Sequence, residues 1–199
     1  MKKTYHHGDL RQQLLNQAAI MIRIEGEAGL SMRKLAAQVG VSRTAPYHHF
    51  KDKHELLCAI AEEGFRRFVE MRKDMVNMDD PVSKEGISRL VKGYVKFATQ
   101  YPEYYDLMFG GHLWQSGALT ASLKEKAFHS FRSEVEIVKG WQDRGLLSKD
   151  IDVLRYAQVS WSTMHGMSRL LIDGIYVDKN AVEAMCDTAV AMFLNHLQQ

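Results

Sequence analysis

Apolar residues recur at helical spacing along most of the chain, and no stretch alternates apolar and polar residues as a half-buried strand would. Asn77–Pro81 interrupts the pattern, and Gly110–Gly111 interrupts it again. The predicted helices cover about residues 9–25, 32–39, 42–49 and 52–75, a segment that ends before Pro102, residues 103–109 and 119–144, about 25 residues from Asp152, and residues 180–197. The sequence therefore predicts an all-α protein without internal repeats.

The stretch from Leu30 to Lys53 is predicted to form two short helices joined by a tight turn. Ser31 can cap the first helix, since its hydroxyl can accept a hydrogen bond from a backbone N–H two or three residues later. Gly40 follows the last apolar residue of that helix, where glycine readily adopts the positive φ that ends a helix. Ser42 can cap the second helix. The pattern indicates a helix-turn-helix, in which the second helix enters the major groove of DNA.

The net charge of the chain is only +2, but it is unevenly distributed. Residues 1–51 carry eight Lys and Arg against three Asp and Glu, a net charge of +5. The remaining residues carry 18 basic and 21 acidic side chains, a net charge of −3. The basic excess therefore lies with the helix-turn-helix, as a phosphate-binding surface requires.

Composition and hydropathy are those of an ordinary globular protein, with 46% hydrophobic and 25% charged residues. No apolar run approaches the roughly 20 residues that span a membrane, and no apolar signal segment follows the basic N-terminus. We therefore expect a cytoplasmic protein that does not bind membranes. Cys58 and Cys186 lie in apolar helical contexts and are expected to be buried free thiols, with a redox-sensing pair as the alternative.

Residues from about Asp9 to Ala61 resemble the N-terminal domain of the tetracycline-repressor (TetR) family. The matching features are Leu35-Ala36, Gly40-Val41-Ser42 at the turn, Tyr47-x-x-Phe50, and Lys53-x-x-Leu56 at the start of the next helix. The resemblance implies a dimeric transcriptional regulator, more often a repressor than an activator, with a C-terminal domain that responds to a ligand. It also implies that Tyr47 and Lys53 contact the DNA backbone.

Several exposed positions of the helix-turn-helix are candidates for DNA contacts. Arg43 and Thr44 lie at the N-terminal edge of the second helix, where Arg43 can donate to both O6 and N7 of a guanine. Tyr47 and His48 can donate to phosphates or reach bases. The predicted DNA-binding residues are Arg33, Ser42, Arg43, Thr44, Ala45, Tyr47, His48, Lys51 and Lys53. No further ligand is spaced near His48 and His49, so neither a metal site nor a cofactor is predicted.

The predicted domains are a helix-turn-helix domain at 1–51, a connecting helix at 52–75, and a helical ligand-binding and dimerisation domain at 76–199. Asp52 and Glu55 form a capping-box-like pair at the start of the connecting helix. The positive end of that helix dipole suits a DNA phosphate. Because this helix continues into the second domain, it can carry a rotation between the two domains.

Trp161 and His165 lie one turn apart on one face of a helix, and Gly166 follows. This Trp-x-x-x-His-Gly spacing resembles the C-terminal domain of one subset of TetR-family regulators. Two interpretations stay open: a core histidine that bonds a neighbouring carbonyl or hydroxyl, and a polar group in a ligand cavity. The candidate ligand-binding residues are Met108, Phe109, Trp114, Trp161, Met164, His165 and Ser168.

The last predicted helix is apolar over more than one narrow stripe, so it is either deeply buried or shared with a partner. By resemblance, the last two helices pair with their mates in a homodimer as a four-helix bundle. The predicted operator is then roughly palindromic double-stranded DNA, with half-sites about 10 bp apart or somewhat more.

The predicted function is sequence-specific transcriptional regulation, with release from the operator by an unidentified small molecule. Two alternatives remain: a DNA-architectural protein without a ligand, and a small helical enzyme. The sequence contains no Gly-rich phosphate loop, nucleophile elbow, metal triad or paired carboxylates at catalytic spacing, so we do not expect an enzyme.

Overall fold

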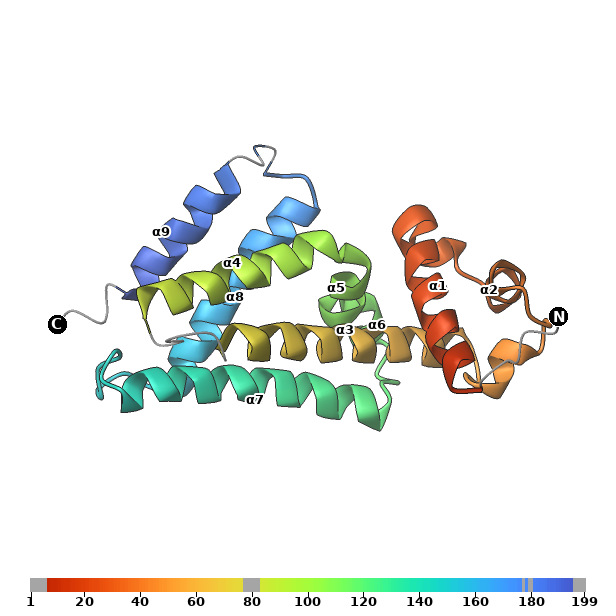
Figure 1. Cartoon of the computed structure of the whole chain (residues 1–199), viewed down its shortest axis with the longest axis horizontal. Coiled ribbons are helices and arrows are strands. Elements are labelled where there is room, and N and C mark those ends of the chain that lie inside the picture. Colours follow the sequence, from red (N-terminus) through yellow and green to blue (C-terminus); the bar gives the residue numbers. More distant parts are fainter. Residues whose placement is uncertain (1–6, 77–82, 177, 179–180, 195–199) are drawn as a thin grey trace. The chain divides into compact units, whose positions relative to one another are not determined.

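The computed structural model describes residues 7–76, 83–176, 178 and 181–194, and Figure 1 shows the helices in chain order. They are α1 (His7–Gly29), α2 (Met32–Val39), the 3₁₀ helix η1 (Ala45–His48), α3 (Lys53–Val76), α4 (Lys84–Gln100), α5 (Pro102–Phe109), α6 (Gly111–Gln115), α7 (Ala121–Asp143), α8 (Val153–Ile172) and α9 (Val182–Leu194). The described residues contain no strand, which confirms the all-α prediction. The predicted break at 77–81 and the predicted ends of the last helix, 180 and 197, lie outside the described residues.

The chain divides into two compact units. The first unit contains the chain up to Phe65 together with residues 102–126, and the second contains residues 66–101 and 127 onward. Helices α3 and α7 each contribute residues to both units. The domain boundaries predicted at residues 51 and 75 come from the helix pattern of the sequence and do not coincide with the boundaries of these units. They stay a prediction.

The first unit is built around the N-terminal part of α3. Leu14 of α1, Leu35 of α2 and Leu56 of α3 are completely buried. Gly64 lets α5 approach α3 closely, because a Cβ added there would lie only 2.7 Å from the Sδ of Met108. Helices α1 and α2 and the N-terminal part of α3 therefore share a core, to which α5 also belongs.

The second unit has an aromatic core that connects α3, α4 and α8. The Phe68 ring lies 5.2 Å from the rings of both Tyr94 and Phe97, measured between centroids. Trp161 of α8 lies 6.4 Å from Phe68 and 5.2 Å from Phe131 of α7. Helix α4 also packs against both α8 and α9. Trp161 is therefore part of a packed aromatic cluster.

The first helix is longer than predicted. Helix α1 extends to Gly29, although Gly26 within it has φ 71° and ψ 173° and so kinks the helix. A positive φ is accessible to glycine without steric penalty. Gly26 therefore ends the regular part of α1 at the predicted position, and a further short turn follows it.

The prediction of an α-helix over residues 42–49, capped by Ser42, is wrong. The chain forms the 3₁₀ helix η1, whose N-cap is Thr44, and no side chain caps it. The Tyr47 N–H donates to the carbonyl of Thr44 at 3.0 Å, an i→i+3 bond. Pro46 has no N–H to donate to the carbonyl of Ser42, as an α-helix would require, so the tighter bonding pattern replaces it.

Candidate functional site

The first helix of the helix-turn-helix has both of its predicted caps. The Ser31 Oγ accepts a hydrogen bond from the Lys34 N–H at 3.2 Å. At the other end, Gly40 has φ 77°, and its N–H donates to carbonyls in the last turn of α2. The Val41 N–H donates to the carbonyl of Ala36 at 3.0 Å, which completes the turn. Both predictions are confirmed, and they fix where the following segment begins.

Two buried side chains anchor the segment that follows the turn. Pro46 and Phe50 are buried, and Phe50 is only 1% exposed. The Phe50 N–H also donates to the carbonyl of Pro46 at 2.9 Å. The Arg11 guanidinium lies 5.3 Å from the centroid of the Phe50 ring, which adds a cation–π contact from α1. These contacts hold η1 against the rest of the first unit. The other side chains of η1 therefore point outward.

The predicted DNA-binding residues lie mostly on the exposed surface of this unit. Ala45 and Lys53 are half-buried, and seven are exposed: Arg33, Ser42, Arg43, Thr44, Tyr47, His48 and Lys51. Tyr47 is 54% exposed, which is unusual for a large aromatic side chain. In a 3₁₀ helix, side chains three residues apart align, so Thr44 lines up with Tyr47 and Ala45 with His48. The segment thus presents two short rows of side chains to solvent.

Lys53 has a structural contact of its own. Its Nζ donates to the backbone carbonyl of Glu27 at 2.7 Å, which connects the start of α3 to the end of α1. The capping arrangement at the start of α3 is close to the predicted one. Asp52 Oδ1 accepts from the Glu55 N–H at 2.9 Å, but Glu55 Oε2 accepts from the Lys51 N–H, at 2.7 Å, and not from that of Asp52. Two carboxylates therefore already lie at the helix end predicted to face a phosphate.

The candidate ligand-binding residues divide between the two units. Met108, Phe109 and Trp114 belong to the first unit, where Met108 is completely buried and accepts a hydrogen bond from Trp114 Nε1 at its carbonyl, at 2.7 Å. Trp161, Met164, His165 and Ser168 lie on α8 in the second unit. The structure does not place the seven residues in one described pocket, and their role stays a prediction.

The residues on α8 lie close to the core. Met164 lines a small cavity of about 20 Å³, together with the buried pair Arg72 and Glu134, enough for about one water molecule. Ser168 is completely buried. Burial lowers the pKa of His165, and the positive charge of Arg169 lowers it further. Folding therefore favours the neutral imidazole of His165 over the charged one, relative to the unfolded chain.

Two family models match the chain. The model described as bacterial regulatory proteins, tetR family, matches residues 14–60, and the model of a tetracyclin repressor-like C-terminal domain matches residues 87–193. The chain belongs to the TetR family. Membership confirms the resemblance seen in residues 9–61, whereas the narrower likeness to the Trp-x-x-x-His-Gly subset stays a prediction.

Individual relatives support the same family. The transcriptional repressor AcnR from Corynebacterium efficiens is 30% identical over 124 residues, which cover 62% of this chain and 55% of AcnR. The nucleoid occlusion factor SlmA from Aliivibrio fischeri is 32% identical over 105 residues, 50% of this chain and 51% of SlmA. The chain thus spans about half the length of these curated relatives.

A solved structure matches the whole chain. A protein of unknown function from Rhodococcus sp. RHA1 is 33% identical, the match covers 100% of both chains, and the TM-score is 0.87.

In the part of this TetR-family chain that the structure describes, no helix is long and apolar enough to cross a membrane. The same residues contain no group of three or more His, Cys, Asp or Glu placed to hold a metal ion.

Proposed function

We propose that the protein is a sequence-specific transcriptional repressor that binds a palindromic operator as a homodimer and leaves it when a small molecule binds. The observation that carries this proposal is the exposed Arg43–Lys51 segment, anchored by Pro46 and Phe50 inside a region that matches the TetR-family DNA-binding model. The similarity to AcnR, named as a repressor, supports the sign of regulation. The proposal places the protein in the cytoplasm, with the chromosome.

The second unit offers a surface for pairing with a second copy. Leu154 and Val159 of α8 are 43% and 65% exposed, and Met192 of α9 is 58% exposed. A second copy that covers these side chains would remove them from water, which stabilises the dimer. Two-fold pairing also presents two DNA-reading segments to a palindromic site, so a dimer reads twice as many base pairs.

Release from DNA is proposed to follow from preferential binding of a small molecule to one conformation. Such a molecule shifts the equilibrium only by as much as its affinities for the DNA-binding and free conformations differ. The protein is proposed to be non-catalytic, and the relatives to which it is similar are named as a transcriptional repressor and a nucleoid occlusion factor, not as enzymes.

A second candidate function comes from the match to SlmA, a nucleoid occlusion factor. For this second candidate we propose that the protein binds the DNA of the nucleoid without regulating the genes adjacent to its sites. The two candidates share a DNA-reading surface and differ in where the sites lie and in whether bound protein blocks transcription.

The deciding experiment is selection of bound genomic fragments by the purified protein at about 0.15 M salt, which screens weak backbone binding. A recovered palindrome upstream of genes supports the repressor, and in vitro transcription from that fragment should fall when the protein is added. Recovered sites that are scattered and leave transcription unchanged favour the second candidate. Random fragments, or none even after cell extract is added, contradict both.

A further inference from the structure

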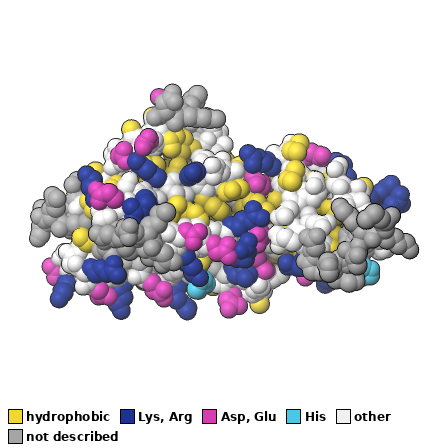
Figure 2. All heavy atoms as spheres, in the orientation of Figure 1, with side chains coloured by type: hydrophobic (Ala, Val, Ile, Leu, Met, Phe, Trp, Pro, Cys, Tyr) yellow, Lys and Arg dark blue, Asp and Glu magenta, His cyan; other side chains and the backbone are white. Residues whose placement is uncertain are grey.

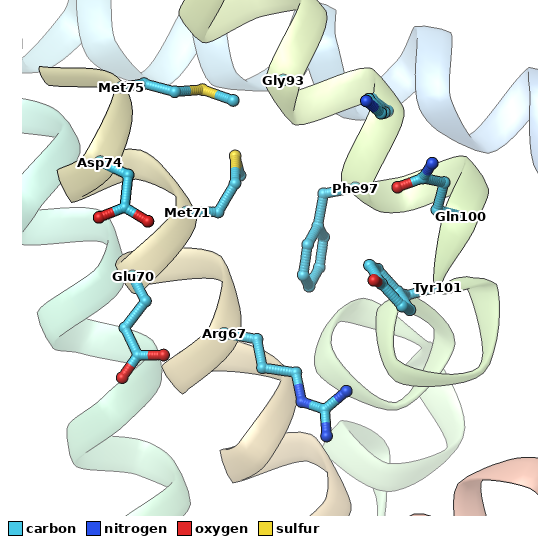
Figure 3. Close-up of a pocket in the computed structure, with 10 residues that line it drawn as sticks. Arg67, Glu70, Met71, Asp74, Met75, Gly93, Phe97, Gln100 and Tyr101 are labelled. Atoms are coloured by element: carbon cyan, nitrogen blue, oxygen red, sulfur yellow. The ribbon is translucent and has the colours of Figure 1, made fainter. Parts of the chain in front are cut away.

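Two spaces of different kinds lie within the second unit. The larger is a groove of about 410 Å³ between α3 and α4, with Met71 and Met75 on one wall and Phe97 on the other (Figure 3). A Cβ added to Gly93 would overlap the Sδ and Cε of Met75, so the absence of a side chain there leaves room for this thioether. Figure 2 shows charged side chains of both signs on the surface, and two basic and two acidic residues line the groove. Its lining therefore favours no single class of ligand.

The smaller space is the cavity of about 20 Å³ in the core of the unit. Three polar side chains line it, one each from α3, α7 and α8: Arg72, Glu134 and Ser160. A cavity needs about 10–15 Å³ of such volume to hold one water molecule. The space therefore admits one molecule of the size of water and nothing larger. Its other walls are apolar and consist of Leu90, Val91, Trp141, Met164 and Phe193.

The guanidinium of Arg72 carries a buried donor that needs an acceptor. Arg72 Nη2 donates to Glu134 Oε2, and both side chains are only 7% exposed. Arg72 Nη1 is buried as well and has no hydrogen-bond partner among the described residues. A buried donor without an acceptor is destabilising, and more so when it belongs to a charged group. Because Arg72 lines the cavity, an oxygen atom placed there can accept from Nη1.

Ser160 and Glu134 can accept hydrogen bonds from the same molecule. The Ser160 hydroxyl donates to the carbonyl of Ala157 at 3.2 Å, and its oxygen can still accept. Each carboxylate oxygen of Glu134 has two lone pairs, so the bond from Arg72 does not saturate the group. The cavity therefore offers one donor and at least two acceptors, which matches the two hydrogens and the lone pairs of water.

The charges around the cavity favour a neutral molecule. Arg72 and Glu134 have opposite charges and already form an ion pair, so their charges sum to zero. An ion added to the cavity would bring an uncompensated charge into the core, which is unfavourable. A wholly apolar molecule would leave Arg72 Nη1 without an acceptor. Size, hydrogen bonding and charge therefore select the same ligand.

We propose that this cavity binds one water molecule, which accepts a hydrogen bond from Arg72 Nη1 and donates to Ser160 Oγ and to Glu134. The water completes the hydrogen bonding of the buried ion pair and connects α3, α7 and α8. Helices α3 and α7 also contribute residues to the first unit. This inference does not depend on the proposed function.

The test counts the long-lived internal water molecules of the full chain by oxygen-17 magnetic relaxation dispersion. Val91→Ile adds one methylene group at a wall of the cavity and changes no polar group, so we expect it to displace the water and lower the count by one. Val159→Ile makes the same change at a 65% exposed side chain and should keep the wild-type count. Equal counts in the wild type and Val91→Ile would overturn the inference.

A second variant removes the polar partners of the water instead of its space. Arg72→Met combined with Glu134→Leu leaves Ser160 as the only polar side chain of the cavity, and a cavity without several polar partners does not hold water. The count should again fall by one. An unchanged count in this double variant would also overturn the inference, whether or not Val91→Ile folds.

Thermal unfolding gives an independent readout of whether the cavity is wet or dry. Displacing the water leaves Arg72 Nη1 without an acceptor, so the melting temperature of Val91→Ile should fall below that of Val159→Ile. An empty cavity would instead be filled by the added methylene group, which raises stability. A higher melting temperature for Val91→Ile than for the wild type would therefore contradict the bound water.

Discussion

The Nζ of Lys53 donates a hydrogen bond to the backbone carbonyl of Glu27, 2.7 Å away. Lys53 begins α3, and Glu27 lies in the last turn of α1. Lys53, which the family resemblance implies as a phosphate contact, thus also holds α1 and α3 together. One ammonium has three N–H donors, so both roles are compatible.

Lys53→Met should therefore lower the free energy of unfolding as well as the affinity for DNA. Loss of a charged hydrogen bond to a partly buried carbonyl is expected to cost about 1–3 kcal/mol. If Lys53 also contacts a phosphate, the slope of log K against log salt should become shallower by about one. Denaturant melts and a salt titration of operator binding check the two effects. Lys51→Met changes an exposed lysine and is the control for stability. If both variants lose the same free energy of unfolding, the structural role of Lys53 is contradicted.

Arg43→Ala should weaken specific binding and relax the operator preference. A bidentate contact from arginine to guanine contributes about 1–3 kcal/mol of discrimination. Arg43 is exposed, so the free energy of unfolding should change by less than about 0.5 kcal/mol. Competition between the operator and single-base variants measures the effect. An unchanged preference at every position would exclude Arg43 from base readout.

The ion pair between Arg72 and Glu134 is buried, with each side chain 7% exposed. Arg72→Met alone, or Glu134→Leu alone, leaves an unpaired buried charge and should lower the free energy of unfolding by about 3–5 kcal/mol. The double variant removes both charges and should recover most of that loss, because buried pairs also carry a desolvation penalty. Chemical denaturation of the four proteins gives the coupling energy. Additive losses would show that the two charges do not depend on each other.

The lowered pKa of His165 predicts a pH dependence of stability. The unfolded histidine, with a pKa of about 6.5, takes up a proton before the folded one does. The stabilisation from neutral His165 is thus fully present above about pH 6.5 and is lost as the pH falls toward the folded pKa. His165→Gln should therefore lose less stability than the wild type between about pH 7.5 and 5.5. His129→Gln changes an exposed histidine of α7 and is the matched control for His165→Gln. A parallel pH profile for His165→Gln and the wild type would contradict the prediction.

A charge on the exposed face of α8 should disrupt the dimer. Val159→Glu places a carboxylate where we propose that a second copy packs, so sedimentation at micromolar concentration should show a shift from dimer to monomer. Ile24→Glu introduces the same charge at a 76% exposed side chain of α1 and should leave the dimer intact. A monomeric wild type, or a dimer that withstands Val159→Glu, would contradict this surface.

The sequence predicts features that depend on local chemistry. Ser31, Gly40 and Asp152 occupy the helix ends expected for them: Ser31 and Asp152 accept backbone N–H bonds, and Gly40 has a positive φ. Such cap positions can be predicted from the sequence, because capping involves only residues that are neighbours along the chain. The 3₁₀ form of residues 45–48 was missed, although Pro46 was the signal that could have revealed it.

Features that depend on pairing between distant helices were not predicted. Met71 and Phe97 each fall on a helical apolar stripe, and nothing in either stripe shows that the two form the walls of one groove. Gly93 gave no signal in the helical pattern, because its effect is on Met75 of a different helix. Trp161 and His165 were correctly placed on one helix, but the packing of Trp161 against Phe131 of α7 depends on how the helices associate.

The anchoring of η1 separates the residues that hold this segment in place from those that are predicted to contact DNA. Pro46 and Phe50 occupy the interior, while Arg43, Thr44, Tyr47 and His48 have no share in the core. Their identities can therefore change over generations, or in a designed library, without unfolding the protein. In the proposed repressor, altering these four side chains would change the operator that is recognised while the buried support stays the same.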